Sequence, residues 1–103
     1  MSASNDIWDR VFEKNPDIMT RQVADETLLV PVRGELSGMQ RLFMLNRVAE
    51  FVWKRLEGQA TLAEIRDAVL ERFEADPADV RQDMAELVEK LSELDLIREK
   101  AGN

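Results

Sequence analysis

The side chains of this chain that could do catalytic chemistry are serines and carboxylates, because it contains no His, no Cys and no Tyr. The usual general base near pH 7, the thiol nucleophile and the common zinc ligands are therefore missing. The four serines are Ser2, Ser4, Ser37 and Ser92. They have no His to activate them, no spacing supports a Ser–Lys pair, and no Gly-rich phosphate loop is present. We expect neither catalysis nor a metal or cofactor.

Binding through the backbone is the second kind of chemistry, and the run from Leu42 to Leu45 is suited to it. Four apolar residues, then Asn46 and a 3.6-residue pattern to Leu56, predict a short strand that ends at a helix N-cap. Two strand-like segments precede the run, and only helices follow it. As the last strand of a small sheet it would lie at an edge, where its backbone N–H and C=O groups are unpaired.

The other strands are predicted over residues 18–23 and 26–32, joined by a tight turn at Ala24-Asp25. Pro31 cannot donate to a ladder and belongs near a strand end. The third strand covers residues 40 or 41 to 45, after a loop with two glycines. The simplest assembly is a three-stranded antiparallel sheet, which needs one covered face to be stable.

Three helices are predicted to supply that cover. The first runs from Asn46 to about residue 57, with Gly58 as its stop. The start signals of the other two are a capping box, Thr61 with Glu64, and an Asp76 N-cap followed by Pro77. Asp95 takes the left-handed cap position after the third helix, Leu96 and Ile97 turn back onto the core, and residues 98–103 form a polar tail.

The N-terminal segment, residues 6–14, is predicted to be a short amphipathic helix that Asn15-Pro16 ends. Its apolar face holds Ile7, Trp8, Val11 and Phe12. A helix this short must dock on something, either its own domain or, through Trp8 and Phe12, a partner or a second copy. The expected organisation is an N-terminal extension over residues 1–15, one domain over 16–98 and a tail over 99–103.

The charge is unevenly spread over the 103 residues, whose net charge is −7. From Glu57 to Glu99 there are 13 acidic and 5 basic residues, so the helical half repels nucleic acid. No apolar run approaches the roughly 20 residues that span a bilayer, and no signal peptide is visible, so we expect no membrane and a cytoplasmic location. The fold class is α+β and winged-helix-like, but the third helix carries carboxylates where a DNA-reading helix has basic and amide side chains.

The motifs in this order resemble the PqqD family. They are Leu29-Val30-Pro31-Val32-Arg33-Gly34, then Leu45-Asn46-x-x-Ala49-x-x-x-Trp53-x-x-Leu56-x-Gly58, then Thr61-x-x-Glu64-Ile65, and Asp83 through Leu94 to Leu96-Ile97. The resemblance covers roughly residues 17–97. It implies a three-stranded sheet followed by a three-helix bundle. It also implies a recognition element that binds the leader of a ribosomally made peptide and presents it to a modifying enzyme, of radical SAM type in pyrroloquinoline quinone (PQQ) synthesis.

In that family the leader is held as an added strand between the third strand and the third helix. The strand residues expected to bind it are Arg41, Leu42, Phe43, Met44 and Leu45, and those of the helix are Val80, Arg81, Met84, Ala85 and Val88. Apolar side chains would form pockets, and Arg41 and Arg81 would hold acidic leader side chains. The alternative for each is ordinary core packing or surface charge.

Two other functions stay open at this stage. A structural module could form a homodimer through the open strand edge and the N-terminal aromatic face. A winged-helix DNA-binding protein is the third possibility, against which the charge of the third helix argues. The sequence names neither the peptide nor the partner enzyme.

Overall fold

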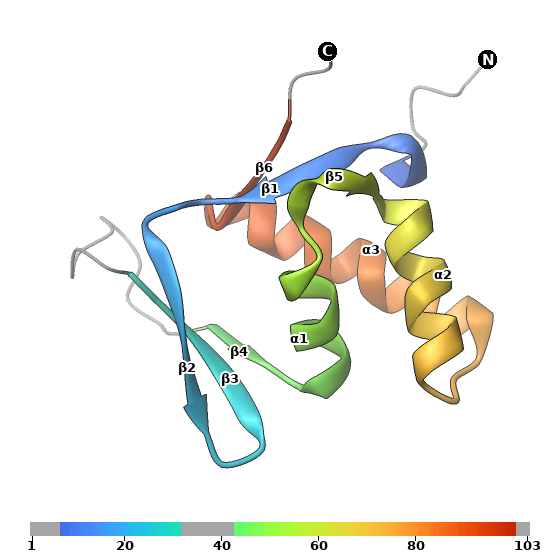
Figure 1. Cartoon of the computed structure of the whole chain (residues 1–103), viewed down its shortest axis with the longest axis horizontal. Coiled ribbons are helices and arrows are strands. Elements are labelled where there is room, and N and C mark those ends of the chain that lie inside the picture. The colour runs from blue at the N-terminus through green and yellow to red at the C-terminus, as the bar shows by residue number, and fades with distance from the viewer. Residues whose placement is uncertain (1–6, 32–42, 101–103) are drawn as a thin grey trace.

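The computed structural model describes residues 7–31 and 43–100, which form an α+β fold with two three-stranded antiparallel sheets and three α-helices (Figure 1). The strands are β1 (Val11–Lys14), β2 (Ile18–Val23), β3 (Glu26–Pro31), β4 (Phe43–Leu45), β5 (Glu57–Thr61) and β6 (Ile97–Glu99). The helices are α1 (Arg47–Lys54), α2 (Leu62–Arg72) and α3 (Pro77–Glu93), and a single 3-10 turn, η2, covers Ile7–Asp9.

The first sheet has the strand order β2-β3-β4 and confirms the three-stranded antiparallel sheet expected from the sequence. The β2–β3 hairpin turns at Ala24-Asp25, where Val23 pairs with Glu26 and Ala24 has a φ of 57°. β4 pairs with β3 through Leu28 and Met44. Residues 40–42, the predicted start of the third strand, lie outside the described residues.

The second sheet, β5-β1-β6, was not predicted, and it corrects the reading of the N-terminal segment. Only Ile7–Asp9 is helical, as a 3-10 turn, and residues 11–14 form the central strand of this sheet. The predicted helix over residues 6–14 is therefore wrong. A nine-residue helix has little stability of its own, whereas β1 gains hydrogen bonds from a strand on each side. The apolar pattern could not reveal strands that lie far along the chain.

The same sheet corrects two boundaries further along. α1 ends at Lys54 rather than near residue 57, and Gly58 lies in β5 with a φ of 80° instead of stopping the helix. The polar tail predicted from residue 98 onward is also wrong at its start, because Ile97–Glu99 forms β6 and pairs with β1. Its end, residues 101–103, lies outside the described residues.

The predicted helix starts are confirmed by their hydrogen bonds. The Asn46 side chain accepts from the Ala49 N–H at 2.8 Å. Thr61 and Glu64 form the capping box, with distances of 3.2 Å and 2.9 Å. Asp76 accepts from the Ala78 N–H at 2.8 Å. These caps satisfy backbone donors that have no partner inside a helix, so the three helices begin where the sequence places them.

The end of α3 is a Schellman motif built on Asp95. The Leu96 N–H donates to the Leu91 carbonyl at 2.9 Å, and the Asp95 N–H donates to the Ser92 carbonyl at 3.1 Å. Asp95 has a φ of 61°, which confirms the predicted left-handed cap. Leu91 and Leu96 are both fully buried, so the apolar contact that accompanies this motif is present.

One hydrophobic core joins the helices to both sheets. Its fully buried side chains include Leu29 and Leu45 from the first sheet and Ile97 from the second. The helices contribute most of the others, among them Val52, Leu62, Ile65, Val69 and Leu91. Because β4 and α3 both pack on this core, the space between them has fixed walls.

Candidate functional site

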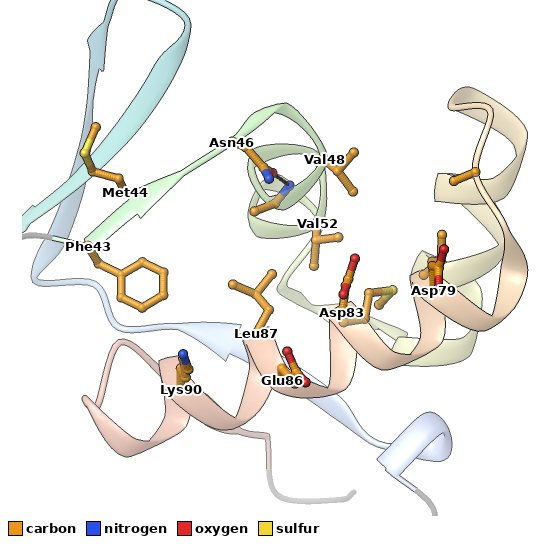
Figure 2. Close-up of a pocket in the computed structure, with 14 residues that line it drawn as sticks. Phe43, Met44, Asn46, Val48, Val52, Asp79, Asp83, Glu86, Leu87 and Lys90 are labelled. Atoms are coloured by element: carbon orange, nitrogen blue, oxygen red, sulfur yellow. Dashed lines mark hydrogen bonds between the residues drawn. The ribbon is translucent and has the colours of Figure 1, made fainter.

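An open groove of about 490 Å³ lies between β4, α1 and α3 (Figure 2). Strand β4 and the residue after it contribute Phe43, Met44 and Asn46, and α1 contributes Val48, Ala49 and Val52. The opposite wall is α3 with the residue before its cap: Ala75, Asp79, Val80, Asp83, Met84, Glu86, Leu87 and Lys90. The Asn46 cap positions the groove, since it fixes where β4 ends and α1 begins.

The floor of the groove is apolar. Val52, Val80 and Met84 are nearly fully buried and belong to the core. Phe43 and Leu87 are half-buried, and they point toward one another from β4 and α3 (Figure 2). A groove with this floor can take up apolar side chains, and the thioether of Met84 can adapt to their shape.

One wall of the groove is a sheet edge. In the order β2-β3-β4 the strand β4 is terminal, and it pairs only with β3 among the described residues. The backbone groups on its other side are therefore open to a further strand. An edge beside an apolar groove is the arrangement in which an extended peptide binds by strand addition.

The rim of the groove on α3 is charged. Asp79, Asp83, Glu86 and Lys90 follow one another at spacings of four, three and four residues, which places them on one side of the helix. All four are exposed. Within the part of the chain that the structure describes, none of them forms an ion pair, and the Glu86 carboxylate accepts one hydrogen bond, from Gln82 at 3.4 Å. The sequence showed that this helix is acidic, but these four residues were not expected to border a binding groove.

Four of the residues expected to bind a peptide line the groove: Phe43, Met44, Val80 and Met84. Leu45 does not, because its side chain is fully buried in the core. Arg41 and Leu42 fall outside the described residues. The residues at the start of α1 that line the groove were not expected. The N-cap signal at Asn46 could have indicated them, because it marks the place where α1 meets the strand.

The other three helix residues lie away from the groove. Val88, which is 4% exposed, and Ala85 face a second hollow of about 570 Å³ on the far flank of α3, beside η2, β1 and β6. Arg81 is exposed and lines neither hollow. The apolar stripe of α3 is wide enough to cover two flanks, so the sequence did not show which flank faces β4.

The N-terminal aromatic residues dock on their own domain. Phe12 is 5% exposed and part of the core. Trp8 is half-buried against the same core, with the Arg66 guanidinium 5.2 Å from its ring centroid. The burial of Phe12 leaves it no free surface for the partner contact considered above.

Comparison with known proteins identifies the family. Residues 26–97 match the family model described as coenzyme PQQ synthesis protein D (PqqD). The chain belongs to the PqqD family. The matched region runs from the start of β3 to the start of β6, so it includes the groove and excludes β1 and β2. No match was found among curated proteins.

Two solved structures share the fold of this PqqD family member. One is "TbiB1 in Complex with the TbiA(beta) Leader Peptide", with a TM-score of 0.66, 21% identity, and coverage of 87% of this chain and 99% of that one. The other is "Lasso peptide synthetase B1 complexed with the leader peptide", with a TM-score of 0.66, 23% identity, and coverage of 84% and 96%. Among the described residues, no helix is both long and apolar enough to cross a membrane.

Proposed function

We propose that this protein is a non-catalytic module that binds the leader segment of a ribosomally synthesised precursor peptide. The leader lies as an added strand on β4, in the groove between β4 and α3. The observation that carries this proposal is the apolar groove directly beside a terminal strand. Family membership supports it, as do the two structures of the same fold, both complexes with leader peptides.

The geometry explains how such binding gains affinity. Each hydrogen bond of an added strand contributes a net of only about 0.5–1.5 kcal/mol. The apolar floor therefore supplies much of the rest, at about 1.5–3 kcal/mol for each fully buried Leu-sized side chain. Phe43 and Leu87 are the half-buried side chains that a guest residue would cover.

The module then presents the bound peptide to a modifying enzyme. By family resemblance that enzyme is of the radical SAM type, and the product is pyrroloquinoline quinone or a related peptide-derived compound made in the cytoplasm. The helical half would keep the winged-helix-like arrangement without reading DNA, because its third helix, α3, lines the groove with carboxylates.

An NMR titration tests this proposal. The probes are synthetic N-terminal segments of the short peptides encoded next to the gene, added to the ¹⁵N-labelled full chain. The amide signals of Phe43, Met44 and the groove flank of α3 should shift, whereas those of Ala85 and Val88 on the far flank should move little. Shifts confined to the far flank, or no saturable shift with any of these segments, would count against the proposal.

Homodimerisation through the same edge is the competing outcome. If a second copy occupies β4, the mass measured by sedimentation should rise with concentration and fall when a binding peptide is added. A constant monomer mass would leave the edge free for a peptide.

A further inference from the structure

The charged rim of α3 is unbalanced at one end. Glu86 and Lys90 are four residues apart and of opposite sign, so their charges offset each other on the helix surface. Asp79 and Asp83 are also four residues apart, but both are negative. Neither forms an ion pair among the described residues, and no group of three or more acidic side chains there is placed to hold a metal ion.

This negative pair borders the apolar groove rather than open surface. Asp79 and Asp83 line it together with Val80 and Val48, at the end formed by the first turns of α1 and α3. Like charges at this spacing repel each other, and a cation placed between them would relieve the repulsion. A guest side chain that reaches this end of the groove would meet both carboxylates.

Resting on the proposed function, we infer that the bound peptide carries a Lys or Arg side chain between Asp79 and Asp83, and an apolar side chain between Phe43 and Leu87. Leu87 and the midpoint between Asp79 and Asp83 are separated by about six residues of α3, or roughly 9 Å along the helix axis. An extended chain covers that length in about three residues. The peptide should therefore place its apolar and basic residues roughly two to four positions apart.

The acidic pair should exclude acidic side chains of the peptide as well as attract basic ones. A peptide with Asp or Glu at this point would be repelled by two carboxylates, so the site would reject acidic leaders. The expected size for an exposed ion pair is about 1.4- to 5-fold in affinity for each carboxylate. It should shrink in high salt, because exposed charges are screened over about 10 Å at 0.1 M ionic strength.

The experiment is a selection of displayed random dodecapeptides on the immobilised full chain. Wild type is compared with the double variant Asp79→Asn/Asp83→Asn, with the control Glu89→Gln/Glu93→Gln, and with Leu87→Gln, which shows whether the captured peptides use the groove. The control removes two charges at the same spacing from α3, at positions that do not line the groove. Asp79 lies in the first turn of α3, so a single Asp83→Asn variant, outside that turn, guards against a loss of folding.

We expect peptides enriched on wild type and on the control to carry a Lys or Arg two to four positions from an apolar residue. On the Asp79→Asn/Asp83→Asn variant the apolar residue should stay and the basic preference should vanish. Replacing the basic residue of one enriched peptide by Gln removes its interaction with both carboxylates, so it should weaken binding to wild type about 2- to 25-fold, but hardly change binding to that variant.

Two results would overturn the inference in different ways. In the first, capture of the peptides needs Leu87, but they show no preference for a basic residue, or they show the same preference on the Asp79→Asn/Asp83→Asn variant. That result would refute the charge selection and leave peptide binding intact. A selection in which Leu87→Gln captures the same peptides as wild type would place binding elsewhere, and the proposed function would fail with the inference.

Discussion

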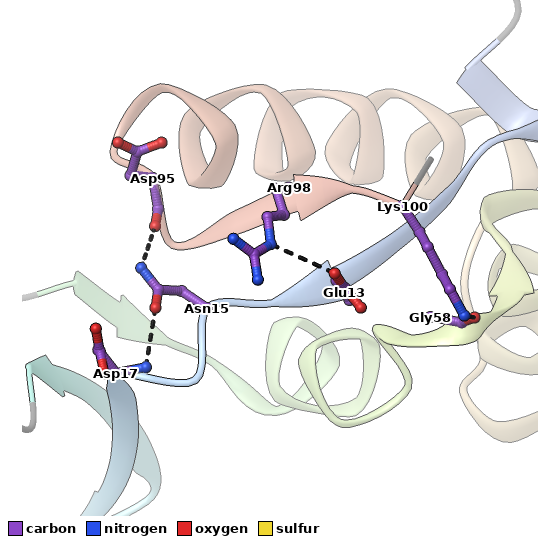
Figure 3. Close-up of polar contacts among 7 residues, drawn as sticks. All are labelled: Glu13, Asn15, Asp17, Gly58, Asp95, Arg98 and Lys100. Atoms are coloured by element: carbon purple, nitrogen blue, oxygen red, sulfur yellow. Dashed lines mark hydrogen bonds and ion pairs between the residues drawn. The ribbon is translucent and has the colours of Figure 1, made fainter. Parts of the chain in front are cut away.

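The side chain of Asn15 donates a hydrogen bond from Nδ2 to the main-chain carbonyl oxygen of Asp95 at 2.9 Å, across 80 residues of sequence (Figure 3). The Asn15 backbone N–H also donates to the Leu96 carbonyl at 2.9 Å, and its Oδ1 accepts from the Asp17 N–H at 2.9 Å. Asn15 therefore ties the turn between the two sheets to the corner after α3. These contacts help fix the first sheet, and with it β4, relative to α3.

Replacing Asn15 tests that connection. Asn15→Ala removes two side-chain hydrogen bonds and should lower the free energy of unfolding by about 1–3 kcal/mol. Asn15→Ser keeps a hydroxyl acceptor for the Asp17 N–H but is too short to reach Asp95, so its loss should be about half as large. Urea denaturation followed by circular dichroism measures both. If the second variant lost no stability, the link to Asp95 would contribute nothing.

The hairpin turn offers a stabilising change. Ala24 has a φ of 57°, a region that costs an L-residue about 1–2 kcal/mol but costs glycine little. After the entropic cost of glycine in the unfolded chain, Ala24→Gly should raise the free energy of unfolding by up to about 1 kcal/mol. Asp25→Gly is the control, because Asp25 is not in the left-handed region. Its free energy of unfolding should fall by about 0.4–1 kcal/mol. A lower denaturation midpoint for Ala24→Gly would contradict the argument.

The N-terminal strand should be essential to the fold. Phe12 is 5% exposed in the core, so Phe12→Ala should lower the free energy of unfolding by about 3–5 kcal/mol, a large share of what a small domain has. Trp8→Ala should cost less, because Trp8 is only half-buried. Guanidinium denaturation at two protein concentrations measures the losses. If Phe12 were a dimer contact, the loss of stability caused by Phe12→Ala would depend on the protein concentration.

The apolar floor of the groove can be probed at Leu87, which packs against the core but is not one of its fully buried residues. The test peptide is one that shifts the β4 amide signals in the titration. Leu87→Gln should weaken its binding by about 1–2 kcal/mol, roughly 5- to 30-fold in affinity, because a polar amide replaces part of the apolar floor. Leu94→Gln is the matched control at the end of α3, where Leu94 is 42% exposed and outside the groove. Fluorescence anisotropy with the labelled peptide gives both affinities. The same affinity for both variants would remove Leu87 from the binding surface.

The parts of the fold that local chemistry fixes were predictable from the sequence. The Asn46 cap, the Thr61–Glu64 capping box and Asp95 each act through neighbours within a few residues, so their types are sufficient. The second sheet depends on distant neighbours instead. Val11 pairs with Thr61, and Phe12 pairs with Glu99. Without those partners, the apolar spacing of the N-terminal segment fits a helix equally well.

The site was predictable as a place but not residue by residue. Phe43 and Met84 were expected on the strand and helix walls of one groove and they line it, since strand alternation and helical spacing put them on the right elements. That they bind a peptide stays a prediction. Val88 and Leu45 carry the same apolar character but are buried away from the groove, because the rotation of α3 and the packing of β4 are set by the tertiary fold. The sequence did not show that Asp79 and Asp83 border the groove, because it did not show which flank of α3 faces β4.

The β5-β1-β6 sheet joins strands from the start, the middle and the end of the described chain. A nascent polypeptide therefore cannot complete this sheet before residue 99 has been synthesised. Closing such long segments is entropically slow, so the helices should form early and the sheet should lock last. The rate-limiting event in refolding should accordingly be sensitive to substitutions in β1 and β6 rather than in the capped helices.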